Sequence, residues 1–169
     1  ALFRVPGWVE HLVKQGSLGR KSGRGFYAKE GNSILVYDIA TQSYRPQRAC
    51  TYESVQSAMQ HKTTLERMRH LLSCDDVAAR FAWTLLSRTI NYSAHRLGEI
   101  ADDVLNIDRA MRWGFNWEYG PFETWDALGV QTTAQRMIDE GLSLPKWVNT
   151  LLEGKENKQF YTHAPLHDT

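Results

Sequence analysis

The residues with the clearest chemical potential are three carboxylates that lie close together among tryptophans. Glu118, Glu123 and Asp126 are the acidic residues of this segment, and the tryptophans around them are Trp113, Trp117 and Trp125. Two carboxylates beside aromatic side chains are typical of glycoside hydrolases, in which one acts as the acid and the other as base or nucleophile. The sequence therefore allows a carbohydrate-active or sugar-binding domain that uses Trp113, Trp117, Trp125 and Glu123.

A structural role for the same residues is the favoured interpretation. Glu123 follows Gly120-Pro121, a pair that typically begins a helix, so its carboxylate falls in the first turn, where the helix dipole favours negative charge. Asp126 lies about one turn further on, near the same face. Large tryptophans mostly serve as core or interface anchors. We therefore predict no catalytic residue in this segment.

A basic, glycine-rich segment offers a second kind of chemistry, the binding of phosphate. Residues 19–25 read GRKSGRG and follow a predicted helix. Their backbone N–H groups could cradle an anion. However, the segment lacks the spacing of a nucleotide-binding P-loop, and it leads from a helix into a strand, the reverse of the order in phosphate-binding turns. A solvated or packing loop is therefore favoured.

No other group of residues has the spacing of a catalytic or metal site. The sequence contains neither Gly-x-Ser-x-Gly nor Gly-x-Gly-x-x-Gly. No zinc-ligand spacing occurs among the histidines, which are His11, His61, His70, His95, His163 and His167. We expect His95 and Glu99, one helical turn apart, to form a surface pair. The sequence therefore predicts no catalytic, cofactor-binding or metal-binding residue.

The overall charge and the cysteines narrow the partners and the compartment. Among 169 residues, 20 Lys plus Arg balance 19 Asp plus Glu, so the net charge of +1 does not attract nucleic acid. No apolar run reaches the roughly 20 residues that span a membrane. Cys50 and Cys74 fit a reducing compartment best, although one disulfide stays open as an alternative. We expect a cytoplasmic protein with no nucleic-acid or membrane partner.

The elements that position these residues begin with a short helix and a small sheet. Pro6 and the apolar residues after it predict a helix over residues 5–15. Residues 16–25 are expected to hold no regular structure and to form a loop. Aromatic and β-branched residues separated by turn residues then predict a small antiparallel hairpin or meander over residues 25–46.

The rest of the chain is predicted to be helical. Thr63 and Glu66 have the spacing of a capping box and begin a helix that ends near Ser73. A ladder of apolar residues from Ala78 to Ala101 predicts a long helix of roughly 25 residues with one buried face. Further helices are expected over residues 107–113, capped by Asn106 and closed by Gly114, and over 121–128, 132–140 and 144–153. The predicted fold class is mainly α.

The end of the sequence repeats a pattern from its beginning. A Pro-x-Trp helix start followed by a Phe-Tyr pair occurs over residues 6–27 and again over residues 145–161. The tryptophans are offset by 139 residues (147 − 8) and the Phe-Tyr pairs by 134 (160 − 26), so the spacing changes only in a loop, where a change of length costs little. Two unrelated amphipathic helices are the alternative. A true repeat is favoured, and it makes residues 1–29 the end of a first copy.

Two stretches together resemble one enzyme family. Residues 18–27, LGRKSGRGFY, are similar to the segment that closes the C-terminal domain of NAD-dependent 3-hydroxyacyl-CoA dehydrogenases. The helical signature of that domain resembles IDRAM at residues 107–111, GF at 114–115 and GPFETWDALG at 120–129. In single-copy members the closing segment follows the signature, whereas here it precedes it. The chain therefore resembles the multifunctional β-oxidation enzymes, which carry two such domains in tandem.

The resemblance implies a helical bundle of the dehydrogenase C-terminal type, with the small antiparallel sheet near residues 25–46. Residues 1–29 would end the first copy of the domain. Residues 30–74 would form the β hairpin and a helical connector. Residues 75–163 would be the second copy, and residues 164–169 a tail or linker. A start at Ala1 instead of Met also suggests a piece of a longer protein, although removal of Met before Ala would look the same.

The family resemblance also implies the chemistry of the parent enzyme. It would oxidise the 3-hydroxyl of an acyl-CoA thioester in fatty-acid β-oxidation and pass the hydride to NAD. The catalytic His–Glu pair and the cofactor belong to a Rossmann domain outside this sequence, so no NAD is expected on this chain. The implied partners are that Rossmann domain, the first helical domain of the same parent chain and the acyl-CoA substrate. Alone, the chain is expected to self-associate, with a homodimer as one form.

One departure from the family pattern argues against catalysis by this copy. Where the family has a substrate-contacting Asn followed by Arg, this sequence has Trp83-Thr84. The second copy would then pack against the first and cover the acyl-CoA cleft. A helical interaction module with no enzymatic parent is the other rival, and the sequence flanking this chain in its gene would separate the two.

Overall fold

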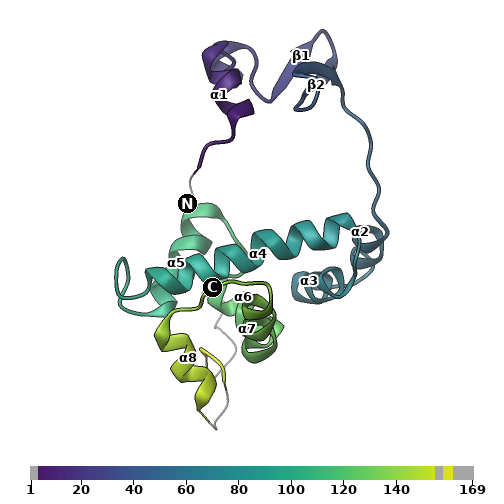
Figure 1. Ribbon diagram of the computed structural model, residues 1–169. Helices are drawn as coiled ribbons and strands as arrows, with labels where there is room; N and C mark the ends of the chain where they lie inside the picture. The colour runs from purple at the N-terminus through teal and green to yellow at the C-terminus, as the bar shows by residue number, and fades with distance from the viewer. Residues whose placement is uncertain (1–3, 155–157, 162–169) are drawn as a thin grey trace. The chain divides into compact units, whose positions relative to one another are not determined.

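The computed structural model describes residues 4–154 and 158–161 of a mainly helical chain with one small sheet (Figure 1). It divides into two compact units, residues 1–50 and residues 51–169. The first unit therefore holds the sheet, and the second unit holds the helical bundle. The predicted fold class is confirmed by this architecture.

The first unit combines one helix with an antiparallel meander. Helix α1 begins directly after Pro6, whose fixed backbone suits a helix start, and buries Leu12. The strands pair in the order β1-β2-β3. The bounds are α1 Gly7–Lys14, β1 Tyr27–Glu30, β2 Ser33–Asp38 and β3 Ser43–Pro46. The prediction of an unstructured loop over 16–25 is wrong in part, because Arg20–Ser22 form a short 3₁₀ turn.

The helical unit starts with two short helices that pack near the beginning of a long one. Helix α3 carries the predicted capping box, in which the Thr63 hydroxyl accepts from the Glu66 N–H and the Glu66 carboxylate accepts from the Thr63 N–H. Asp76 caps the long helix α4 through the Ala79 N–H. The bounds are α2 Glu53–Ala58, α3 Thr64–Ser73 and α4 Val77–Arg96.

The long helix is shorter than predicted. It contains 20 residues and stops at Arg96, because Gly98 adopts a left-handed conformation with φ of 81°. The apolar ladder continues past this point because Leu97 and Ala101 form a β bridge and pack against the core. The buried face of the first half runs through Ala79 and Trp83, one position after the predicted ladder.

The capping of the next helix also differs from the prediction. Helix α5 spans Val104–Phe115, and its N-cap is Asp103, whose carboxylate accepts the Asn106 N–H at 2.7 Å. Asn106 itself lies inside the first turn. Gly114 does not end the helix, which instead closes at Asn116 in a left-handed conformation with φ of 56°. The Asp103 carboxylate, three residues before Asn106, accepts the free N–H in the first turn of α5.

Three further helices complete the bundle, and their start and end points lie within two residues of those predicted. They are α6 Pro121–Leu128, α7 Val130–Asp139 and α8 Lys146–Glu153. Their buried faces share one core with α4 and α5, with Phe122, Trp125, Ile90, Met137 and Val148 at its centre.

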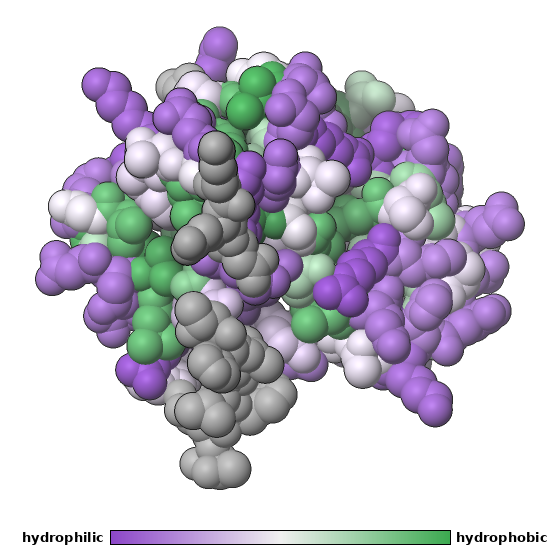
Figure 2. Space-filling view, turned by 90° about the horizontal axis from the view of Figure 1, so that it is seen from below, coloured by the Kyte–Doolittle hydropathy of each residue, from purple (hydrophilic) through white to green (hydrophobic). Residues whose placement is uncertain are grey.

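The surface of the molecule mixes apolar and polar residues. On the face seen in Figure 2, hydrophobic residues form separate patches among hydrophilic side chains. Among the described helices, none has both the length and the apolar character that a membrane crossing demands. The buried carboxylates Asp108 and Glu123 lie on α5 and α6, within the helical signature.

Candidate functional site: a buried carboxylate cluster on α5 and α6

Asp108 is the centre of the buried polar cluster. It lies on α5, is fully buried, and accepts the Phe122 N–H at 2.9 Å and the Glu123 N–H at 2.8 Å. These are free N–H groups in the first turn of α6, which have no partner within their own helix. Asp108 therefore caps α6 from a neighbouring helix, where the helix dipole also favours its negative charge.

Gly120 allows this close approach. A Cβ atom at position 120 would lie 2.4 Å from Asp108 Cβ, Cγ and Oδ1. Only glycine leaves room for the carboxylate against the chain at the start of α6. The glycine of the Gly-Pro helix start thus has a packing role that the sequence did not indicate.

The environment of Asp108 shifts its protonation. Burial raises the pKa of Asp108 to about 6, against hydrogen bonds from Phe122, Tyr161 and Glu123 that lower it. The Tyr161 hydroxyl donates to Asp108 Oδ2 at 2.8 Å. Burial, with the Asp108 carboxylate beside it, raises the pKa of that hydroxyl, so Tyr161 stays protonated and remains a donor at neutral pH. The pair holds two segments together and exposes no reactive atom.

Glu123 has a structural role, as the sequence favoured. Its carboxylate accepts the Gly120 N–H at 2.6 Å and pairs with Arg112 at 3.1 Å. It is buried, and Arg112 is mostly buried. Because both carboxylate oxygens have partners, Glu123 is part of a satisfied ion pair, the usual state of a buried charge.

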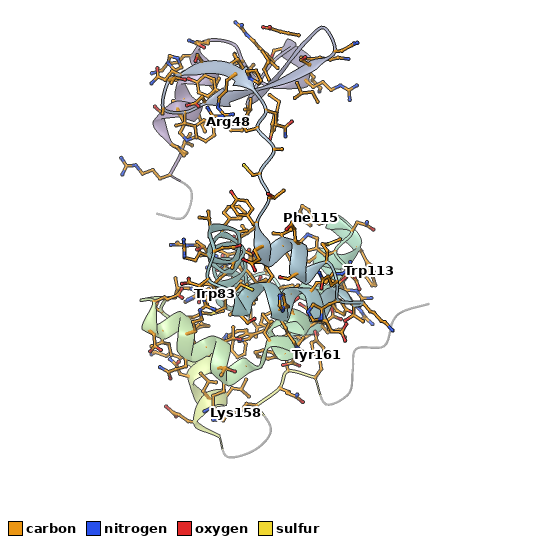
Figure 3. The ribbon with its side chains drawn as sticks, turned by 90° about the vertical axis from the view of Figure 1, so that its right-hand side faces the viewer. Arg48, Trp83, Trp113, Phe115, Lys158 and Tyr161 are labelled. Carbon is orange, nitrogen blue, oxygen red and sulfur yellow. The ribbon has the colours of Figure 1, made fainter. Side chains whose placement is uncertain are left out.

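Asp126 holds the end of the described chain onto the bundle. Its carboxylate accepts the Phe160 N–H at 2.8 Å and the Tyr161 N–H at 2.9 Å. Burial raises the pKa of Asp126, against the two backbone hydrogen bonds. Figure 3 labels Tyr161 beside the helical bundle. Asp108 and Asp126 together therefore receive both the backbone and the side chain of Tyr161.

The tryptophans do not form a sugar-binding wall. Trp125 is fully buried, and its indole N–H donates to the Val130 carbonyl. Trp113 is 69% exposed and projects from the surface at the end of α5 (Figure 3). Glu118 accepts a hydrogen bond from the Thr64 hydroxyl at 2.6 Å. A buried ring cannot face a saccharide, and the carboxylates have structural partners, so nothing in this geometry favours the carbohydrate alternative.

Trp83 occupies the position where the family pattern expects a substrate contact. It is 5% exposed, and its indole N–H lies 2.6 and 2.7 Å from the two Glu140 carboxylate oxygens. The Arg136 guanidinium stacks on its ring at 3.9 Å. An open cavity of about 470 Å³ lies beside this stack, with Arg69 and Leu128 in its lining. Trp83 is therefore a packing residue between α4 and α7.

The glycine-rich segment 19–25 closes on itself. The Ser22 hydroxyl accepts the Leu18 N–H at 2.8 Å, and the N–H groups of Gly19, Gly23 and Gly25 donate to backbone carbonyls of the same segment and of Tyr27. These groups are therefore not free to cradle a phosphate. The geometry supports the favoured interpretation of a packing loop.

The described histidines and cysteines assemble no metal site. In the described parts of the chain, no group of three His, Cys, Asp or Glu residues could hold a metal ion. The predicted His95–Glu99 pair is wrong, because His95 bonds the Ser143 carbonyl at 3.0 Å and Glu99 pairs with Arg96. Cys50 and Cys74 are both free. His163 and His167 lie outside the described residues.

One small cluster was not predicted. His70 Nε2 lies 2.8 Å from the Ser57 hydroxyl and 3.9 Å from the Cys74 sulfur. Ser57 also donates within helix α2, to the Glu53 carbonyl at 2.8 Å. Among the described residues no carboxylate orients His70, so the cluster lacks the third member of a catalytic triad. It links α2 to the end of α3.

The family comparison decides which protein class the carboxylate cluster belongs to. Residues 81–162, which include Asp108, Gly120 and Asp126, match the family described as the C-terminal domain of 3-hydroxyacyl-CoA dehydrogenase. This region is similar to that family. The resemblance seen in the sequence is confirmed, and the carboxylate cluster lies within the matched region.

Curated relatives are named as a 3-hydroxyacyl-CoA dehydrogenase or as enzymes of fatty acid oxidation. A Bacillus subtilis 3-hydroxyacyl-CoA dehydrogenase is 41% identical over 95% of this chain. Proteins named as fatty acid oxidation complex trifunctional enzymes, from Rickettsia felis and Rickettsia prowazekii, are each 25% identical over 68% of it. The chain spans only 20% of the Bacillus protein and 15% of each Rickettsia protein. No solved structure matched it significantly.

The carboxylate cluster uses residues to which no sequence pattern gave a role. Asp108 lies in the IDRAM stretch that carried the resemblance, yet no local pattern marked it as a cap for a later helix. Tyr161 was noted only as half of a repeated pair. Their connection requires the packing of α5 against α6, which sequence spacing does not give.

Proposed function

We propose that the chain is the C-terminal part of an NAD-dependent 3-hydroxyacyl-CoA dehydrogenase of fatty-acid oxidation, and that it acts as a scaffold without catalysis of its own. The observation that carries this proposal is the engagement of its buried carboxylates. Asp108, Glu123 and Asp126 each accept hydrogen bonds that hold a helix start or the segment at residues 160–161 in place. The names of its relatives support the dehydrogenase parent.

The chemistry of the parent is the transfer of a hydride from the 3-carbon of a 3-hydroxyacyl-CoA to NAD, with the hydroxyl proton passing to a base. The residues described in this chain do not fit the cofactor. Their sheet is a three-stranded antiparallel meander, whereas dinucleotide binding uses a parallel sheet with a glycine-rich turn before a helix. We therefore place NAD, the His–Glu pair and the acyl-CoA contacts on other parts of the parent.

The domain organisation that we propose is a tandem repeat. Residues 1–29 would end a first helical domain, residues 30–74 would connect, residues 75–163 would form the second domain, and residues 164–169 would be a tail or linker. The second domain would pack against the first and cover the acyl-CoA cleft. A cytoplasmic location and a homodimer of the isolated chain are part of the same proposal.

A direct test compares this chain with its parent. Purified chain mixed with NAD and a 3-hydroxyacyl-CoA should give no NADH absorbance, because it lacks the hydride-transfer groups. The parent polypeptide encoded by the same gene should give clear turnover in the same assay. Turnover by the chain alone, or a gene with no Rossmann domain upstream, would overturn the proposal.

A further inference from the structure

We propose that the aromatic edge of the first unit, formed by Trp8, Phe26 and Tyr27, docks onto a helical body that presents two buried carboxylates. One carboxylate would receive the Tyr27 hydroxyl and the other the Tyr27 N–H. The docking partner is a helical domain with the fold of α5 and α6, located earlier in the same parent chain. This inference rests on the proposed tandem organisation and adds the contacts that join its parts.

The repeated segments share a proline-started helix and a contact between tryptophan and phenylalanine rings, although Tyr27 begins strand β1 and Tyr161 lies outside any strand. Helices α1 and α8 each contain eight residues and each begin after a proline, with φ of −65° at Pro6 and −66° at Pro145. The Trp8 and Phe26 ring centroids are 5.5 Å apart, and those of Trp147 and Phe160 are 5.9 Å apart. The loop between tryptophan and phenylalanine differs in length, yet the contact is kept.

The second segment shows what such a unit binds. The Phe160 ring lies 5.1 Å from both Phe122 and Trp125, between centroids. The Tyr161 N–H donates to Asp126 at 2.9 Å, and its hydroxyl donates to Asp108 at 2.8 Å. The binding site of the second segment, called the seat below, therefore consists of two aromatic rings and two carboxylates, all supplied by α5 and α6.

The first segment has the same donors without that seat. Tyr27 is 56% exposed, and within the part of the chain that the structure describes its hydroxyl makes no hydrogen bond. The Tyr37 N–H donates to the Phe26 carbonyl, so the next pair, Tyr27 with Val36, is the non-bonded kind and the Tyr27 N–H points away from β2. Strand β1 is the outer strand of the sheet, and on its outer side Arg24 forms a β bridge with Ala28 while the Gly25 N–H donates to the Tyr27 carbonyl.

The same unit also exposes apolar side chains. Val13 and Leu18 are 55% and 67% exposed, and both lie in or just after α1. Exposed apolar side chains on a small unit are typical of a surface that another domain covers. A seat of the α5–α6 type would bury both kinds of group at once.

The chain's own helical unit is a poor docking partner for the aromatic edge. Its Asp108 and Asp126 already accept Tyr161 and Phe160, so a second Phe-Tyr segment would have to displace the first. The 41% identical relative is about five times as long as this chain, which leaves room for another helical domain. We therefore propose an earlier helical domain of the parent as the docking partner.

Tyrosine nitration by tetranitromethane tests the inference on unmodified protein. In this chain Tyr27 should be nitrated readily and Tyr161 protected, as read by mass spectrometry. In the parent polypeptide both should be protected, with the Tyr27 rate lowered at least roughly tenfold by a hydrogen bond to a buried carboxylate. Equal nitration of Tyr27 in chain and parent would overturn the docking.

Substitution gives a second measurement. In the parent, Tyr27→Phe should raise the rate of proteolytic cleavage around residues 16–25 roughly tenfold, while Tyr52→Phe, at an exposed linker position, should leave it unchanged. Equal cleavage rates for the two variants would contradict the inference. A parent that oxidises 3-hydroxyacyl-CoA while Tyr27 stays reactive refutes only the docking. A gene with no helical domain upstream refutes the proposed function as well.

Discussion

The contact between Gly120 and Asp108 gives the sharpest prediction. Gly120 has an ordinary backbone conformation, with φ of −74° and ψ of 172°, which alanine adopts without strain. Any destabilisation by Gly120→Ala therefore comes from a steric clash and not from backbone strain. Its new methyl group would meet three Asp108 atoms at 2.4 Å, far inside the contact distance of about 3.5 Å between carbon atoms.

The size of the effect follows from what must move. Inserting a methyl group into a packed interior costs about 1–3 kcal/mol. Displacing Asp108 also weakens its bonds from Phe122, Glu123 and Tyr161, and hydrogen bonds to a charged group contribute about 1.5–3 kcal/mol each. Because the carboxylate can shift without losing all three, we expect Gly120→Ala to lower the free energy of unfolding by about 3 kcal/mol. That is a large share of the 5–15 kcal/mol of an ordinary domain.

Gly114→Ala is the matched control. Gly114 lies inside helix α5, and an added Cβ there would meet nothing within 4 Å. Alanine in an exposed helix interior is about 0.5–1 kcal/mol more favourable than glycine, so this variant should be more stable than the unsubstituted chain. The two variants carry the same chemical change on neighbouring elements, yet they should shift stability in opposite directions.

Urea unfolding followed by circular dichroism measures both variants. The expected result is a lower midpoint for Gly120→Ala and a higher one for Gly114→Ala, with the slope against urea unchanged. Loss of less than about 0.5 kcal/mol in Gly120→Ala would refute the reasoning, since it would mean that Asp108 does not fill the space beside position 120.

Two further predictions concern the same bundle. Burial raises the pKa of Asp108 to about 6, so between about pH 4 and 6 the folded protein binds more protons than the unfolded chain. The contribution of Asp108 to the free energy of unfolding is therefore largest near pH 4 and declines as the pH rises towards 6. Asp108→Asn should remove this decline, which unfolding at several pH values measures, and an unchanged slope would contradict it. Trp83→Phe loses the bond to Glu140 and weakens the Arg136 stack, so it should cost about 1–2 kcal/mol in urea unfolding, whereas Trp113→Phe at an exposed position should stay within about 0.5. Equal effects of the two tryptophan variants would refute the packing role of Trp83.

Much of the secondary structure could be predicted because its signals are local. The capping box of Thr63 and Glu66, the Gly120-Pro121 helix start and the turn-separated strands before Pro46 all act within a few residues, and the structure confirms each. Choices between nearby candidates were less certain. Asp103 and Asn106 are both residue types that cap helices. The structure uses Asp103, whose carboxylate accepts the free N–H of Asn106.

The buried site could not be predicted because its parts are distant along the chain. Asp108 bonds Phe122 and Tyr161, which lie 14 and 53 residues later. Trp83 bonds Glu140, 57 residues later. The sequence led us to expect His95 to pair with Glu99, but packing of α4 near residue 143 offered a backbone carbonyl instead. Pairings of this kind depend on which helices meet.

The sequence by itself determined the helical class and the family resemblance, because periodicity, glycine and proline positions and the helical signature are all written in residue order. Only the tertiary structure decided that Asp108 caps a neighbouring helix and that Asp126 holds Phe160 and Tyr161 on the bundle. The physical reason is that a buried carboxylate needs several donors at once, and here those donors come from segments that only the fold brings together.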